Sequence, residues 1–131
     1  MANLTLRGML ESYKDLNVYQ SAIEGAVEIY QLTKRFPTEE KYSLTDQIRR
    51  SSRSVCANLA EAWRKRRYRA AFISKLNDAE GEACETQVWA ELASRFEYLT
   101  ASQSGILDSR YDRILGQLVA MIEKADHFLI H

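Results

Sequence analysis

Residues 108–129 read DSRYDRILGQLVAMIEKADHFL and carry the clearest structural pattern in the chain. Apolar side chains recur here at intervals of three and four residues, which is the spacing of one face of an α-helix. The predicted buried stripe is Tyr111, Ile114, Leu115, Leu118, Met121, Ile122, Ala125, Phe128 and Leu129. Asp108 can cap the start of this helix, because residues 100–105 (TASQSG) have the composition of a loop.

The same spacing predicts three further helices, over residues 15–35, 43–63 and 70–99. Ser43, with Asp46 three residues later, resembles a capping box at the start of the second. The first helix is expected to bury Leu16, Tyr19, Ile23, Ala26, Val27 and Tyr30. The second is expected to bury Leu44, Ile48, Ser52, Val55, Leu59, Ala62 and Trp63. The third is expected to bury Phe72, Leu76, Ala79, Ala83, Val88, Leu92, Phe96 and Leu99.

The composition of the 131-residue chain favours the same architecture. A hydrophobic content of 46% suffices for one core, while five Gly and one Pro are too few turn residues for many short strands. Short connections place neighbouring helices antiparallel, so the predicted fold is an all-α, antiparallel up-and-down four-helix bundle over residues 15–131, after an N-terminal arm or lead-in at 1–14. Trp89, Tyr98 and Val119 lie off the predicted buried faces, which indicates either self-association or half-buried side chains at the bundle edges.

Residue types that carry catalysis or bind metals are sparse. The two histidines, His127 and His131, both lie at the C-terminus, and no Glu-x-x-His motif is present. We therefore predict no catalytic residues, no cofactor and no metal, and we expect Cys56 and Cys84 to be buried thiols of a reduced protein. Neither a secretory signal nor an apolar run of about 20 residues is visible, so we expect a cytoplasmic protein that does not enter the membrane.

The charged residues are strongly segregated, although the 18 basic and 18 acidic residues cancel. Residues 49–69 hold eight cations against the single acid Glu61, a local charge of plus seven. Residues 77–97 hold six acids against Arg95 alone, a local charge of minus five. With no net charge, any attraction to a polyanion must come from this local clustering.

Arginine predominates in the basic segment, and its planar guanidinium group suits bidentate contacts with phosphate. Two aromatic residues, Trp63 and Tyr68, interleave with the cations and could stack on unpaired bases. The candidate nucleic-acid-binding residues are Arg49, Arg50, Arg53, Arg64, Lys65, Arg66, Arg67, Tyr68 and Arg69. Two alternatives stay open: the cations pair with the acidic segment, within the chain or across a subunit boundary, or they bind an acidic protein.

Four short motifs together resemble the four-helix-bundle family of the 23S rRNA-intervening sequence proteins. They are Leu16-x-Val18-Tyr19, Phe36-Pro37-x-x-Glu40-x-Tyr42-x-Leu44, Gln47-Ile48-Arg49-Arg50-Ser51 and Ser54-Val55-x-x-Asn58-Leu59-Ala60-Glu61. Downstream, Phe72, Leu76, Ala79, Glu82 and Glu85 are similar as well. The family often has Gly where this chain has Ala62 and Arg64, so the second helix is expected to run on or to lead into a stiffer connection.

The resemblance implies a bundle that assembles into a ring-like homopentamer. Nucleic-acid binding follows by analogy with related bundles that serve as accessory factors of diversity-generating retroelements. We therefore predict a non-enzymatic homo-oligomer that binds RNA or other nucleic acid through the basic segment. The alternative is a protein-interaction scaffold, with no nucleic-acid binding, in which the basic and acidic segments close subunit interfaces.

Overall fold

The computed structural model describes residues 11–130, which form four α-helices and no strand. The helices are α2 (Asn17–Thr33), α3 (Leu44–Arg64), α4 (Arg69–Arg95) and α5 (Ala101–Glu123), with short 3-10 turns at Tyr13–Asp15, Thr38–Glu40 and Ala125–His127. The predicted all-helical fold with four helices is confirmed. Residues 1–10 of the predicted arm and His131 lie outside the described residues. No helix within residues 11–130 combines the length and apolar character needed to cross a bilayer.

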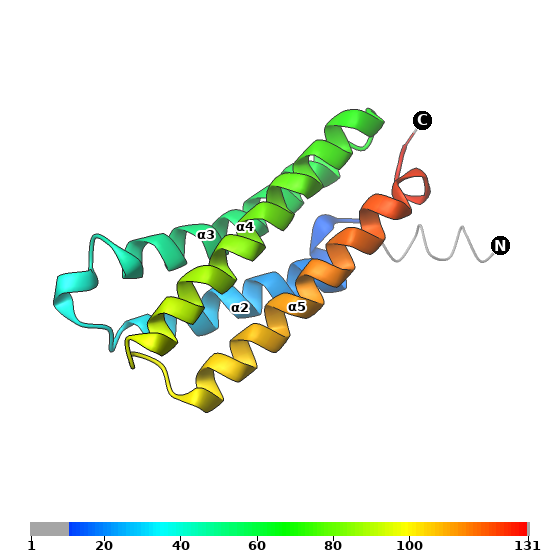
Figure 1. Cartoon of the computed structure of the whole chain (residues 1–131). Helices are drawn as coiled ribbons and strands as arrows, with labels where there is room; N and C mark the ends of the chain where they lie inside the picture. The colour runs from blue at the N-terminus through cyan, green and yellow to red at the C-terminus, as the bar shows by residue number, and fades with distance from the viewer. Residues whose placement is uncertain (1–10, 131) are drawn as a thin grey trace.

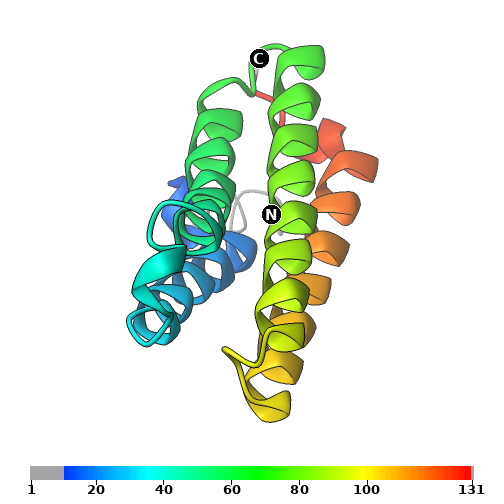
Figure 2. The same ribbon diagram turned by 60° about the vertical axis from the view of Figure 1, so that its left-hand side comes forward.

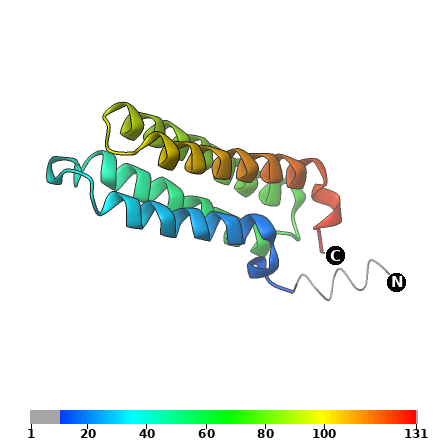
Figure 3. The ribbon, with the colours of Figure 1, turned by 90° about the horizontal axis from the view of Figure 1, so that it is seen from below.

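The four helices close around one core (Figure 1). Helix α2 packs against α3 and α5, and α4 packs against the same two helices. Seen from the side and from below, α2 and α3 form one layer and α4 and α5 form the other (Figure 2, Figure 3). The α3–α4 connection lies at the same end of the molecule as the C-terminal segment (Figure 1).

The predicted stripe of the second helix is confirmed, because all seven of its residues are buried in α3. Several of them are small, which lets α4 approach closely. Two buried hydroxyls meet at this contact, where Ser51 Oγ and Thr86 Oγ1 are hydrogen-bonded at 2.8 Å. Thr86 Oγ1 also donates to the carbonyl oxygen of Glu82. A hydrogen bond between two helices satisfies polar groups that would otherwise be costly to bury.

The predicted stripe of the first helix is wrong at three of its six residues, although Leu16 is buried as predicted and Tyr19 and Ala26 are half-buried against the core. The residues buried in α2 are Val18, Ala22, Gly25, Ile29 and Thr33, whereas Ile23, Val27 and Tyr30 are exposed. The helix has two apolar faces, and the one with small residues turns inward because α5 comes very close. A Cβ added at Gly25 would lie 2.8 Å from the hydroxyl oxygen of Tyr111.

The third predicted stripe is wrong at Val88 and Phe96, although Leu99 at its end is buried as predicted and Leu92 is half-buried against the core. Phe72, Leu76, Ala79 and Ala83 are buried in α4, as predicted. Farther along, Thr86, Ala90 and Ala93 face the core in place of the predicted Val88 and Phe96, which are exposed. The buried residues of this second half of α4 are thus small, whereas two of the larger apolar residues are exposed.

The start of α5 and the cap of α3 differ from the prediction. Helix α5 begins at Ala101, because Thr100 and Gln103 form a capping box. The Thr100 hydroxyl accepts from the Gln103 backbone N–H, and the Gln103 side-chain oxygen accepts from the Thr100 backbone N–H. Most of the predicted loop at 100–105 is therefore helical. Asp108 lies inside α5 and does not cap its start. The predicted Ser43–Asp46 capping box is absent, since the Ser43 hydroxyl donates to Glu40 Oε1 instead.

The end of α4 has no obvious sequence signal. The backbone turns at Glu97, which has a positive φ of 66°. The N–H of Glu97 donates to the Ser94 carbonyl, and the N–H of Tyr98 donates to the Ala93 carbonyl. This pair of bonds is a Schellman motif, in which Gly is the usual residue at the left-handed position. Because Glu occupies that position, the sequence predicted a helix that ran on to residue 99.

Candidate nucleic-acid interface

Residues 64–69 run from the last residue of α3 to the first residue of α4 and are named the basic tip. Helix α3 ends at Arg64, where the Lys65 N–H donates to the Ala62 carbonyl at 3.0 Å. The Tyr68 N–H then donates to the Lys65 carbonyl at 3.1 Å, and the Tyr68 carbonyl accepts from Phe72 at 2.9 Å. The helix therefore runs on past Ala62, as expected, and its end is followed by a hydrogen-bonded turn.

The C-terminal segment, residues 125–130, packs against the basic tip. The Phe128 ring lies 6.0 Å from the Phe72 ring, and the Ile130 N–H donates to the Arg66 carbonyl at 3.1 Å. Arg69 Nε lies 2.9 Å from Asp126 Oδ1. These contacts join residues that are far apart in sequence, so no local pattern could have predicted them.

The Arg66 side chain is occupied by contacts within the protein. Its guanidinium carbon lies 3.6 Å from the centre of the Trp63 ring, and its Nε donates to the Trp63 carbonyl at 2.8 Å. Burial lowers the pKa of this guanidinium from its ordinary value. Trp63 itself is only 6% exposed and is covered by Arg66. The prediction that Trp63 could stack on a base is therefore wrong.

The remaining residues of the basic tip are accessible. Arg64, Lys65 and Arg67 are exposed, and none of them forms an ion pair with another residue in the range 11–130. The Tyr68 side chain is 70% exposed. Arg69 is exposed as well, but its charge is partly balanced by Asp126.

Three of the four arginines of α3, Arg49, Arg50 and Arg53, form a group nearer its start, since Arg49 is about 22 Å from Arg64 along a helix that rises about 1.5 Å per residue. Arg49 Nε donates to Thr33 Oγ1 at 2.8 Å, and its guanidinium lies 4.9 Å from the centre of the Tyr30 ring. Arg50 donates to Gln47 Oε1 at 3.2 Å. Arg53 is exposed and has no hydrogen-bond or ion-pair partner among the described side chains.

The acidic segment of α4 forms no ion pair with these cations in the described part of the chain. Its ion pairs within the described part of the chain are Lys75–Asp78 at 3.6 Å and Arg95–Glu91 at 3.2 Å. Burial raises the pKa of Glu82, as does neighbouring Glu85, while the charge of Arg50 opposes the shift. Between residues 11 and 130, none of the eight cations of the basic segment is within ion-pair distance of an acid in 77–97.

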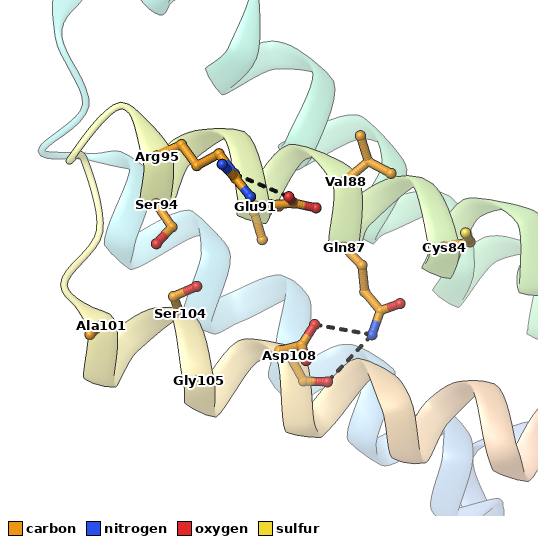
Figure 4. Close-up of a pocket in the computed structure, with 11 residues that line it drawn as sticks. Cys84, Gln87, Val88, Glu91, Ser94, Arg95, Ala101, Ser104, Gly105 and Asp108 are labelled. Atoms are coloured by element: carbon orange, nitrogen blue, oxygen red, sulfur yellow. Dashed lines mark hydrogen bonds and ion pairs between the residues drawn. The ribbon is translucent and has the colours of Figure 1, made fainter.

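A groove of about 730 Å³ runs between α4 and α5 (Figure 4). Gln87 crosses it and donates to Asp108 Oδ1 at 3.5 Å and to Asp112 Oδ1 at 2.9 Å. Cys84 lines the groove and is exposed, so the prediction that both cysteines are buried is wrong for Cys84. Cys56 is buried as predicted, and burial raises the pKa of its thiol to about 11. No cluster of three metal-ligating side chains occurs among the described residues, in this groove or elsewhere.

Residues 14–120 match the sequence model of the 23S rRNA-intervening sequence protein family. The chain belongs to this family. The resemblance carried by the four motifs is thereby confirmed. The matched range includes helices α2, α3 and α4 and the whole basic tip, whereas the C-terminal segment that packs against the tip lies beyond it.

Several solved chains match this member of the family, among them one that is similar in both fold and sequence. It is the crystal structure of a protein with unknown function from the S23 ribosomal protein family of Bacteroides thetaiotaomicron, with a TM-score of 0.73 and 38% sequence identity. The similarity covers 81% of this chain and 95% of that one. No curated protein gives a significant match.

Proposed function

We propose that this protein is a non-enzymatic, homo-oligomeric, antiparallel four-helix bundle that binds RNA or another nucleic acid through the basic tip. The observation that carries the proposal is the exposure of Arg64, Lys65 and Arg67 without an ion-pair partner among residues 11–130. Positive charges without counterions favour a polyanion, because each phosphate contact releases condensed counterions. Arg53 and Arg50 extend the positive surface along α3.

Self-association would multiply this effect. Helix α2 exposes Ile23, Val27 and Tyr30, which lie on one side of the helix at intervals of four and three residues. An exposed apolar stripe of this kind favours contact with another protein surface. If the chain forms the pentameric ring that its family resemblance implies, the ring presents five copies of the basic tip, and binding of one strand gains from multivalency.

The proposal is tested by fluorescence anisotropy with a labelled structured RNA and a matched duplex DNA, each titrated at low and at physiological salt. We expect affinity to fall steeply with salt, with each phosphate contact contributing about 0.7–0.9 to the slope of log affinity against log salt concentration. The double variant Arg64→Glu, Arg67→Glu should flatten that slope and leave the oligomer mass unchanged.

The matched control is Arg113→Glu, which reverses an exposed arginine on α5, outside the basic segment, that forms no ion pair within residues 11–130. This variant should bind like the parent protein. The proposal is wrong if the intact oligomer binds neither probe at low salt, or if the control weakens binding as much as the double variant does.

The second candidate function is a protein-interaction scaffold, which the exposed apolar stripe of α2 favours. In this case the α3 arginines close subunit interfaces against the acidic α4 of a neighbouring copy. Arg53 is the cleanest probe, because it is exposed and makes no contact that the chain itself needs. Arg53→Glu should then lower the oligomer mass in light scattering, and the purified protein should carry no nucleic acid by its ultraviolet absorbance ratio.

A further inference from the structure

Tyr68 differs from every other exposed aromatic side chain in the described part of the molecule. Four aromatic residues between 11 and 130 are exposed: Tyr30, Tyr42, Tyr68 and Phe96. Lysines lie over the rings of Tyr30 and Tyr42, and the Phe96 ring packs edge-on against Tyr98. Of these four, Tyr68 alone has neither an aromatic nor a cationic group against its ring.

The backbone that carries Tyr68 is held firmly although its ring is free. Its N–H donates to the Lys65 carbonyl of the turn, and its carbonyl accepts from Phe72 in the first turn of α4. On either side of it, the Arg66 carbonyl accepts from Ile130, and Arg69 pairs with Asp126. The C-terminal segment therefore supports the turn from outside. An aromatic ring on a pre-ordered backbone loses little conformational entropy when a ligand covers it.

We propose that Tyr68 is a stacking platform for an unpaired base, so that the basic tip selects single-stranded segments over continuous duplex. This inference rests on the proposed function and names the class of ligand for it. In a duplex both faces of each base are covered by its neighbours, whereas an unpaired base can lay one face on an exposed aromatic ring. The flanking Arg67, together with Lys65 and Arg64, supplies contacts for the phosphates of the same strand.

Tyr42 shows why exposure alone is not enough. Its side chain is 85% exposed, more than that of Tyr68, but it follows Glu39 and Glu40 in the chain and Lys41 lies 5.4 Å from its ring centre. Carboxylates repel the phosphates of an approaching strand. Tyr42 is therefore a matched control, since it offers an exposed tyrosine on a connection at which the charge pattern is unfavourable.

The test measures affinity for a short unpaired RNA and for the same RNA annealed to its complement, by fluorescence anisotropy at low salt. Tyr68→Ala should weaken binding of the unpaired strand by about fivefold or more, the typical contribution of one base stacked on an aromatic ring, and should change binding of the duplex much less. Tyr68→Phe keeps the ring and should bind like the parent. Tyr42→Ala should change neither affinity.

Two results overturn the inference, and they differ from failure of the proposed function. If Tyr68→Ala binds the unpaired strand as the parent does, or weakens strand and duplex equally, Tyr68 is not a platform for bases. Salt-dependent binding through the cations could then persist. If the parent binds neither RNA at low salt, the proposed function is wrong, and the inference with it. Thermal unfolding of each variant verifies the fold. Tyr68→Phe removes only the hydroxyl group and so tests whether the ring alone suffices for binding.

Discussion

The two groups of arginines in the basic segment teach different lessons, although both were equally prominent in the sequence. In α3, Arg49 donates to Thr33 and stacks on Tyr30, so its charge serves contact between two helices. In the basic tip, Arg64 and Arg67 reach solvent without an ion-pair partner in the described chain. Whether a cation is free to bind a ligand thus depends on the residues that neighbouring elements place beside it. The following variants test this distinction.

The largest effect is expected from Trp63→Ala, since Trp63 is the buried ring on which Arg66 rests. Removing a buried tryptophan side chain should lower the free energy of unfolding by about 3–5 kcal/mol. Urea denaturation followed by circular dichroism measures this loss, and Trp63→Phe, which keeps an aromatic ring under Arg66, should lose much less. A loss below about 1 kcal/mol for the alanine variant would show that Trp63, next to the basic tip, contributes little to the core.

Arg49→Met should lower the free energy of unfolding by about 2 kcal/mol, because a hydrogen bond to a charged donor and a cation–π contact are both removed. Methionine keeps most of the apolar stem, so the loss reports on the polar contacts. Arg53→Met is the control and should change stability by less than about 0.5 kcal/mol. Equal losses of stability in the two variants would contradict the distinction between Arg49, whose side chain contacts α2, and Arg53, whose side chain is exposed.

Arg69→Gln should cost about 0.2–1 kcal/mol, the usual contribution of an exposed ion pair. Its partner Asp126 is even more accessible to solvent than Arg69, so the effect should shrink as salt is added. A double-mutant cycle with Asp126→Asn in urea denaturation isolates the pair. A coupling energy that does not change with salt would contradict the description of this contact as an exposed pair.

The smallest effect on stability is expected from the double variant Arg64→Gln, Arg67→Gln. Neither side chain has an ion-pair partner within residues 11–130, so the free energy of unfolding should stay within about 0.5 kcal/mol of the parent. The same variant should bind RNA more weakly at low salt. A clear loss of stability would instead assign these arginines to the fold and remove the main support for the basic tip as a binding surface.

The sequence predicted the four helices and the buried stripe of α3 because both depend on local periodicity. It failed at α2, where two apolar faces compete and periodicity alone cannot rank them. The inward face holds Ala22 and Gly25, since α5 brings Tyr111 close to Gly25. The same failure recurs in α4, where Ala90 and Ala93 are buried and Val88 is not. In both cases small residues are buried where the periodicity had favoured larger apolar ones.

For the candidate site, the sequence identified the basic residues and Tyr68 but could not sort them. It treated Trp63 and Tyr68 as equivalent aromatics, whereas Arg66 covers the first and leaves the second free. It also missed the contacts of Asp126 and Ile130 with the basic tip, because these residues are remote in the chain.

By itself, the sequence determined the helical architecture, the segregation of charge and the membership of the 23S rRNA-intervening sequence protein family. These properties follow from residue type and spacing, which are local. Only the tertiary structure decided which apolar residues of α2 and α4 were buried, which arginines stayed in solvent and which aromatic ring was uncovered. Those outcomes depend on how closely two helices approach and on which distant side chain fills the space between them, and neither quantity is encoded in the periodicity of a single helix.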